Sequence, residues 1–161
     1  MKYQKHLKEV ERIFNETISH KKLRLHSSER DTLFETYIWK KFINSLNQND
    51  LRYYPNLKEL YKKISLHYKI TEPYNIILGE GSDRIIKYVF ECFCKKNSIV
   101  ITTNPCFPMY IVYSKLYHGK IIAIPYKELS VDIDKIIKKI NIKTSIVILS
   151  NPNSPVGDLI S

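Results

Sequence analysis

Residues 75–93 read NIILGEGSDRIIKYVFECF: a short apolar run, a turn with two of the chain's four glycines, and a pattern of helical spacing. Residues 75–78 are predicted to form a β-strand and residues 79–83 a turn. A helix is expected next, because apolar residues then recur at steps of three and four: Ile85, Ile86, Val89, Phe90 and Phe93. A strand, a turn and a helix in succession are typical of an α/β domain.

The rest of the chain repeats this alternation. Strands are predicted at residues 98–103, 120–124 and 144–149, helices at 107–118 and 132–140, and a polar turn at 150–157. Strands that alternate with helices favour a mostly parallel sheet covered by helices on both faces. The expected fold class is therefore α/β.

Helical patterns precede the first predicted strand. The spacing of apolar residues predicts helices at 2–20, at 32–46 and from about 57 to 68, and Asn56 can cap the third of them. The polar residues 47–50 are predicted to end the second helix, and 51–55 to form a short loop. We divide the chain into an N-terminal helical segment, residues 1–50, and a larger domain, residues 51–161.

Composition narrows the class of protein. The 161 residues are 43% hydrophobic and 26% charged, which are globular values and argue against a disordered or fibrous chain. The net charge of +10 comes from 21 Lys and five Arg scattered along the sequence, whereas nucleic-acid sites favour clustered Arg, so nucleic-acid binding is disfavoured. Three cysteines without a CxxC pair and the lack of an apolar run of about 18 residues predict a cytoplasmic protein without a membrane partner.

Three of the predicted loops follow strands, where open α/β sheets bind ligands. The first, residues 79–83, opens a helix whose free N–H groups could bind an anion, although Gly-Ser-Asp is also an ordinary capping turn. The second, residues 104–110, sets Phe107 between two prolines, where it could stack on a planar ligand or simply pack the next helix. The third, residues 151–157, offers amide and hydroxyl groups, or is a plain tight turn.

Taken together with an upstream loop, these motifs resemble the class I and II aminotransferases, the fold-type-I pyridoxal-phosphate enzymes. The histidinol-phosphate aminotransferase-like group is the most similar. The four matching motifs, in the family's order, are Tyr54-Pro55, Gly81-Ser82-Asp83, the run from Pro105 to Tyr110, and the run from Asn151 to Gly157. The resemblance covers about Leu25 to the end and implies an incomplete large domain, with a mostly parallel sheet flanked by helices and preceded by N-terminal helices.

The resemblance also implies a cofactor, pyridoxal 5'-phosphate, and residues that hold it. Gly81 allows close approach of the backbone, while Ser82 and Asp83 donate backbone N–H groups to the phosphate and Ser82 adds its hydroxyl. Phe107 takes the place of the aromatic residue that stacks on the pyridine ring. Asn153 and Ser154 belong to the loop that holds the ring, with Ser154 at the place of the amide that binds the phenolic oxygen. Tyr54 reaches the phosphate of the neighbouring subunit, which implies a homodimer.

The chain departs from the family pattern in ways that bear on activity. Phe107 lacks the hydroxyl of the usual tyrosine, Ser154 replaces an asparagine and Val156 a threonine. In the family, the lysine that holds the cofactor covalently and acts as the general base comes after the Asn-Pro-Asn loop, as do the aspartate that pairs the pyridine nitrogen and the arginine that binds the substrate carboxylate. No residue of this chain is assigned a catalytic role, so we expect a fragment that is inactive alone.

The leading interpretation is the N-terminal segment of an aminotransferase that moves an amino group between an amino acid and an oxo acid. A pyridoxal-phosphate decarboxylase of the same fold shares every motif quoted above and is the alternative within the family. A non-catalytic remnant that binds pyridoxal phosphate or another phosphate is the alternative outside it. No metal site is expected.

Overall fold

The structure is a computed structural model that describes residues 30, 32–71, 75–128, 130–154 and 156–160. The described residues up to Ile76 form one compact unit and those from Ile77 onwards form another, and each unit is described by itself. The helix predicted at 2–20 lies outside the described residues. The division into segments 1–50 and 51–161 remains a prediction.

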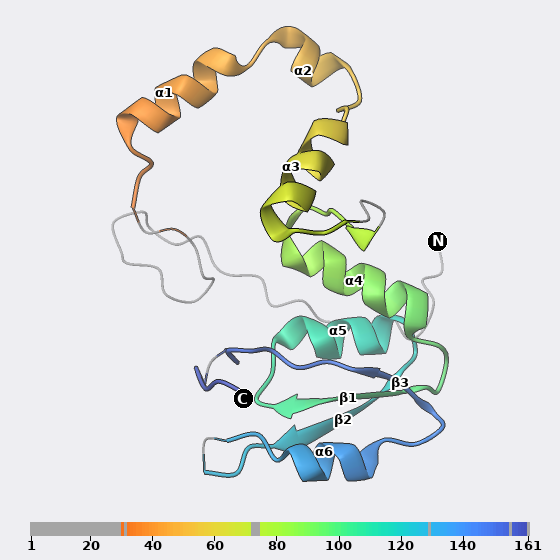
Figure 1. The fold of residues 1–161 in the computed structure, drawn as a ribbon. Helices are drawn as coiled ribbons and strands as arrows, with labels where there is room; N and C mark the ends of the chain where they lie inside the picture. The colour runs from red at the N-terminus through yellow and green to blue at the C-terminus, as the bar shows by residue number, and fades with distance from the viewer. Residues whose placement is uncertain (1–29, 31, 72–74, 129, 155, 161) are drawn as a thin grey trace, which may run out of the picture. The chain divides into compact units, whose positions relative to one another are not determined.

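The first unit holds three helices, α1 (Thr36–Ser45), α2 (Gln48–Arg52) and α3 (Lys58–Tyr68) (Figure 1). Helices α1 and α3 confirm two of the predicted helices, and the Asn56 side chain accepts a hydrogen bond from the N–H of Lys58 at 3.1 Å. The predicted end of the second helix before residue 47 is confirmed, and residues 53–55 lie outside any helix, but the prediction for residues 48–52 is wrong because they form α2. Asn47 and Asp50 form a reciprocal capping box that starts α2, so these polar residues begin a helix.

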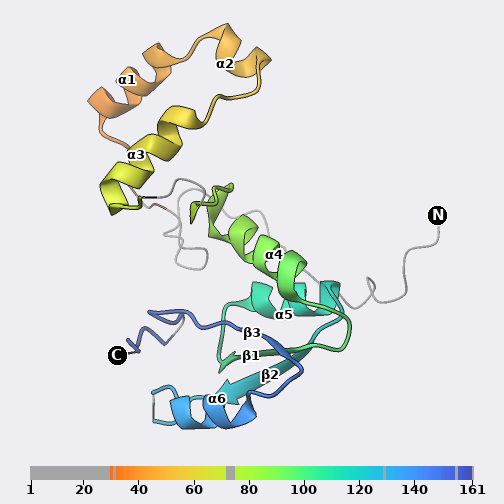
Figure 2. The same cartoon turned by 45° about the vertical axis from the view of Figure 1, so that its right-hand side comes forward.

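The second unit is a three-stranded parallel sheet between helices (Figures 1 and 2). Its strands are β1 (Ile99–Asn104), β2 (Lys120–Pro125) and β3 (Thr144–Val147), in the order β2-β1-β3. Helices α4 (Gly81–Phe93) and α5 (Pro108–Leu116) cover one face of the sheet, and α6 (Ile133–Lys139) covers the other. The α/β fold class with a parallel sheet flanked by helices is confirmed.

The strand predicted at residues 75–78 is wrong. Asn75 lies in a short 3-10 turn, and residues 76–79 have no regular secondary structure. The described pairings join β1 to β2 and β1 to β3, and residues 76–79 take part in neither of them. Ile77 is 68% exposed. An apolar run of this kind is stable as a strand only where a neighbouring strand satisfies its backbone N–H and C=O groups.

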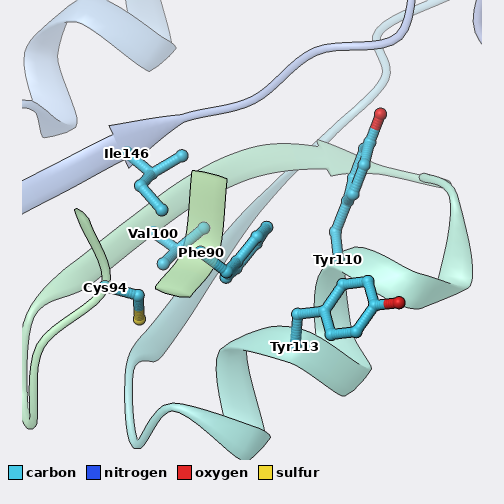
Figure 3. Packing of buried hydrophobic residues seen from close by; sticks show 6 residues of the cluster. All are labelled: Phe90, Cys94, Val100, Tyr110, Tyr113 and Ile146. Atoms are coloured by element: carbon cyan, nitrogen blue, oxygen red, sulfur yellow. The ribbon is translucent and has the colours of Figure 1, made fainter. Parts of the chain in front are cut away.

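The core has two layers, one on each face of β1. Val100 points to the helix pair and packs with Phe90, Cys94, Tyr110, Tyr113 and Ile146, which we call the Phe90 cluster (Figure 3). Ile101, the next residue, points to the opposite face and packs with Ile124 of β2 and Ile136 of α6. This alternation along β1 follows from the period of two in a strand, and it explains why both faces of the strand are apolar.

Helices α4 and α5 run opposite to the strands, so that their N-termini lie at the same end of this unit as the carboxyl ends of β1, β2 and β3 (Figures 1 and 2). The loops that follow the strands lie at this end as well. The sequence motifs quoted above for residues 81–83, 105–110 and 151–157 therefore share one edge of the sheet.

Candidate functional site

The loop after β1 places Phe107 immediately before α5. Phe107 occupies the N-cap position of α5, and Pro108 is the first helical residue, where the lack of an N–H costs nothing. The Phe107 ring is half-buried, packs against the Phe90 cluster and meets the ring of Tyr110 edge-on, with 5.6 Å between the ring centroids. Its position is fixed by packing, as a stacking residue requires.

The loop after β3 is joined to the loop after β1 through Asn153. This side chain is 1% exposed, and its Nδ2 donates a hydrogen bond to the Pro105 carbonyl at 3.0 Å. The same carbonyl accepts a second hydrogen bond from Thr103 Oγ1 at 3.0 Å. The other amide atom, Asn153 Oδ1, is buried and has no protein partner. The donor of Asn153 thus serves the protein, while its acceptor is left for a ligand or a water.

Ser154 follows Asn153 and is exposed. The loop that carries it is closed on itself by backbone and side-chain hydrogen bonds. The Gly157 N–H donates to the Asn153 carbonyl at 2.6 Å, and the Asn151 side chain both donates to and accepts from the backbone of Ile160, each at 3.0 Å. These hydrogen bonds lie on both sides of the exposed Ser154.

The N-terminus of α4 is open. No side chain caps the helix, so the predicted role of Gly-Ser-Asp as a self-capping turn is not what the described residues form. Gly81 has a φ of +79°, and a Cβ built on it would meet nothing within 4 Å. Ser82 is exposed in the first turn, and the Oδ1 of Asp83 is buried without a partner. Unused N–H groups and open space at a helix N-terminus suit an anion.

One ion pair lies beside this helix start. Arg84 Nε is 3.1 Å from Glu80 Oε2, and both side chains are largely in solvent. The pKa of Glu80 lies below its usual value, first because of a backbone hydrogen bond and then because of the hydrogen bond and charge of Arg84. The pair is neutral overall, so the attraction of this helix start for an anion rests on its backbone N–H groups.

Sequence reasoning missed a phenol at the end of β2. Tyr126 OH donates a hydrogen bond to Asp158 Oδ1 at 3.0 Å, and the Tyr126 N–H donates to the Asn104 carbonyl at 3.2 Å. Burial, followed by the hydrogen bond to Asp158, raises the pKa of Tyr126. Its place directly after a parallel strand was the available signal, but Asp158 is 32 residues away and no spacing in the sequence links the two.

The structure brings most of the predicted site residues to one edge. Ile86 in α4, Phe107 before α5 and Ile148 just after β3 all pack against the Phe90 cluster, so the three loops surround one part of the sheet. Tyr54 is different: it is fully exposed and belongs to the helical unit. Its predicted role concerns a neighbouring subunit and remains a prediction.

A hollow lies at the opposite edge of the sheet. It encloses about 960 Å³ and includes the amino ends of the strands, with Lys95, Lys96, Lys120 and Lys143 among its lining residues. None of the four sequence motifs contributes to it. Its cations give it a preference for anions, but no buried polar side chain without a partner faces it among the residues described as its lining.

Comparison with known proteins decides the family. Residues 21–161 match the family model for aminotransferase class I and II. The chain belongs to the class I and II aminotransferases. A histidinol-phosphate aminotransferase from Clostridium novyi is 35% identical over 143 residues, which cover 86% of this chain and 40% of that relative. The chain thus spans about 40% of the length of this curated aminotransferase.

Solved aminotransferase structures have the same fold. The histidinol-phosphate aminotransferase from Sinorhizobium meliloti, solved in complex with pyridoxal-5'-phosphate, matches 75% of this chain and 33% of its own, with a TM-score of 0.66 at 19% identity. The alanine aminotransferase from Pyrococcus furiosus matches 75% of this chain and 32% of its own, with a TM-score of 0.63 at 25% identity. These relatives do not favour the decarboxylase alternative.

The site suits the cofactor of the aminotransferase family, pyridoxal phosphate. The open space at Gly81 and the uncapped first turn of α4 fit a phosphate group. The unpartnered Asn153 Oδ1 and the exposed Ser154 hydroxyl offer polar atoms to a ring. Within the described ranges, no helix has the length and apolar character needed to cross a bilayer, and no three His, Cys, Asp or Glu side chains gather as metal ligands.

Proposed function

We propose that the whole protein is a pyridoxal-phosphate-dependent aminotransferase that moves an amino group between an amino acid and an oxo acid. The Clostridium novyi relative is called a histidinol-phosphate aminotransferase, so histidinol phosphate is the first substrate to test. When bound, the cofactor supplies an electron-withdrawing ring for chemistry at the substrate α-carbon. The residues of this chain bind the cofactor and orient it.

Each site residue has a proposed role in binding the cofactor. The backbone N–H groups of Ser82 and Asp83, together with the Ser82 hydroxyl, bind the phosphate. Phe107 stacks on the pyridine ring, and Ser154 donates its hydroxyl to the phenolic oxygen. Asn153 contributes Oδ1 and holds the two ring-binding loops together through its bond to Pro105. Tyr54 completes the phosphate site of a second subunit in a homodimer.

One observation carries the proposal: an uncapped helix N-terminus with open space at Gly81 lies on the same sheet edge as a rigid aromatic residue and a hydroxyl-bearing loop. A phosphate and a planar ring need these two kinds of group at one place. Phosphate alone would explain α4, but it would leave Phe107 and Ser154 without a role.

Binding of pyridoxamine phosphate to the chain tests these roles directly. This form of the cofactor lacks the aldehyde, so it cannot form imines with the 21 lysines. Gly81→Ala should weaken binding at least about tenfold, because the added methyl group enters the phosphate space and strains a left-handed backbone. Gly157→Ala is the control for backbone strain, since Gly157 has a φ of +81° and equally open surroundings. Because Gly157 lies in the loop that presents Ser154 to the ring, the two variants are compared by their affinity for inorganic phosphate, which that loop does not contact.

Calorimetric titration distinguishes the outcomes. A loss of affinity in Gly81→Ala that clearly exceeds the loss in Gly157→Ala supports the phosphate site, whereas equal losses contradict it. For the activity, the whole protein is supplied with pyridoxal phosphate, amino acid donors and oxo acid acceptors, and new amino acids are detected by mass spectrometry. Release of carbon dioxide without exchange of amino groups would overturn the aminotransferase assignment.

A further inference from the structure

We propose that Tyr126 is a positioning residue of the cofactor site, which acts by holding Asp158 and thereby the loop that presents Ser154. The inference rests on the proposed function of that loop. It assigns a role to a side chain that lies outside all four family motifs.

The loop after β3 needs an external anchor. Its internal hydrogen bonds, from Gly157 to Asn153 and between Asn151 and Ile160, close the loop but do not fix it to the sheet. Asn153 provides one link, to the Pro105 carbonyl on the β1 side. A further link lies at the start of the loop, where Tyr110 OH of α5 and Ser150 Oγ are 2.9 Å apart. Both links come before Ser154 in the chain, so neither fixes the part of the loop that follows it.

Tyr126 provides a further link, from a different strand. Its backbone N–H donates to the Asn104 carbonyl at 3.2 Å and so extends the pairing of β1 with β2 by one residue. Its phenol then donates to Asp158 Oδ1 at 3.0 Å, four residues beyond Ser154. The loop is therefore held before Ser154 by Ser150 and Asn153, and after Ser154 by Asp158, which Tyr126 ties to the end of β2.

The chemistry of the pair suits a structural link. The phenol is the donor and the half-buried carboxylate the acceptor, and hydrogen bonds to charged groups are stronger than those between neutral groups. A tyrosine ring also has few rotatable bonds, so little conformational entropy is lost in holding Asp158. The hydrogen bond from the Tyr126 hydroxyl to Asp158 thus restrains the position of Asp158.

Binding of two probes separates positioning of Ser154 from general damage to the fold. Pyridoxamine phosphate engages both the phosphate and the ring, whereas inorganic phosphate engages only the N-terminus of α4. Tyr126→Phe should weaken pyridoxamine phosphate about fivefold and leave phosphate affinity within about twofold, because only the ring contact depends on the loop. Asp158→Ala should match Tyr126→Phe. Asp158→Asn, which keeps an acceptor oxygen but loses the charge, should weaken pyridoxamine phosphate less than Asp158→Ala does.

Equal weakening of both probes, or no change in Tyr126→Phe, would overturn the inference. Hydrogen exchange supplies a readout without ligand: the Gly157 amide should exchange faster in Tyr126→Phe, while the amides of β1 keep their rates. If the unsubstituted chain does not bind pyridoxamine phosphate, the cofactor contacts proposed for this chain fail. The exchange rate of the Gly157 amide then decides the link by itself, and an unchanged rate overturns it.

Discussion

Replacing Asn153 by aspartate should make the stability of the chain depend strongly on pH. The substitution keeps the size of the side chain but turns the donor that faces the Pro105 carbonyl at 3.0 Å into an acceptor. The Asn153 side chain is 1% exposed. Its neighbours, the carbonyls of Pro105 and Asp158, are hydrogen-bond acceptors, so neither of them offsets a new negative charge. The charged form is therefore disfavoured by burial and by the carbonyl dipole.

The magnitude follows from the burial. A fully buried carboxyl group has a pKa raised by about 3 units or more, which corresponds to about 4 kcal/mol lost at neutral pH. Because the folded-state pKa is raised, the stability deficit is small below the unfolded value near pH 4 and grows as the pH rises towards the folded value. At low pH the protonated carboxyl group can still donate to Pro105. The deficit at pH 8 should exceed that at pH 5 by about 3 kcal/mol.

Urea denaturation of Asn153→Asp and of the unsubstituted chain at both pH values measures this difference. Asn153→Ala is the control without a charge, and it should cost about 1–2 kcal/mol at either pH. The same deficit for Asn153→Asp at pH 5 and pH 8 would refute the reasoning, because it would mean that the side chain at this position is not buried against a carbonyl.

Three other measurements test the packing and the phenol. Gly119→Ala should destabilise the chain by about 1–3 kcal/mol, because the new Cβ would lie 2.6 Å from Cys94 Sγ; adding Cys94→Ala should recover part of the loss in urea denaturation. Phe90→Ala should cost about 3–5 kcal/mol and Ile137→Ala under about 1, since Phe90 is 0% and Ile137 59% exposed; equal costs would contradict the assigned core. Because the pKa of Tyr126 is higher in the folded chain, its phenol contributes stability that is fully present below the unfolded pKa of 10.0 and is lost as the pH rises through the folded pKa. Tyr126→Phe should therefore flatten the dependence of unfolding free energy on pH above about pH 10.

Local patterns in the sequence predict much of the fold because helices and buried strands depend on nearby residues. The spacing of apolar residues predicts α4, a short apolar run predicts β1, and Gly119 predicts the turn after α5, each from a few neighbouring residues. Residues 75–78 show the limit: their apolar run matches a strand, but whether they form one depends on a neighbour that local sequence does not specify. The α2 helix shows another, since Asn47 and Asp50 serve equally well in a turn and in a capping box.

For the site, the motifs predict which loops matter but not how the loops are joined. Gly81, Phe107 and Ser154 are predicted site residues because their loops adjoin predicted elements and match the motifs of the family. The roles of Tyr126 and of the Asn153 side chain depend on distances between residues 32 and 48 positions apart, and such contacts arise only from the register of β1 with β2 and β3.

The most direct test of the account is an amide chemical-shift titration of the labelled chain with pyridoxamine phosphate. The account predicts the largest shifts at Ser82, Asp83 and Ser154, at the carboxyl edge of the sheet. The lysine-lined hollow at the opposite edge provides the internal comparison, because a cationic surface attracts any phosphate. Largest shifts at Lys95, Lys96 and Lys143, with Ser82 and Ser154 unmoved, would contradict the account.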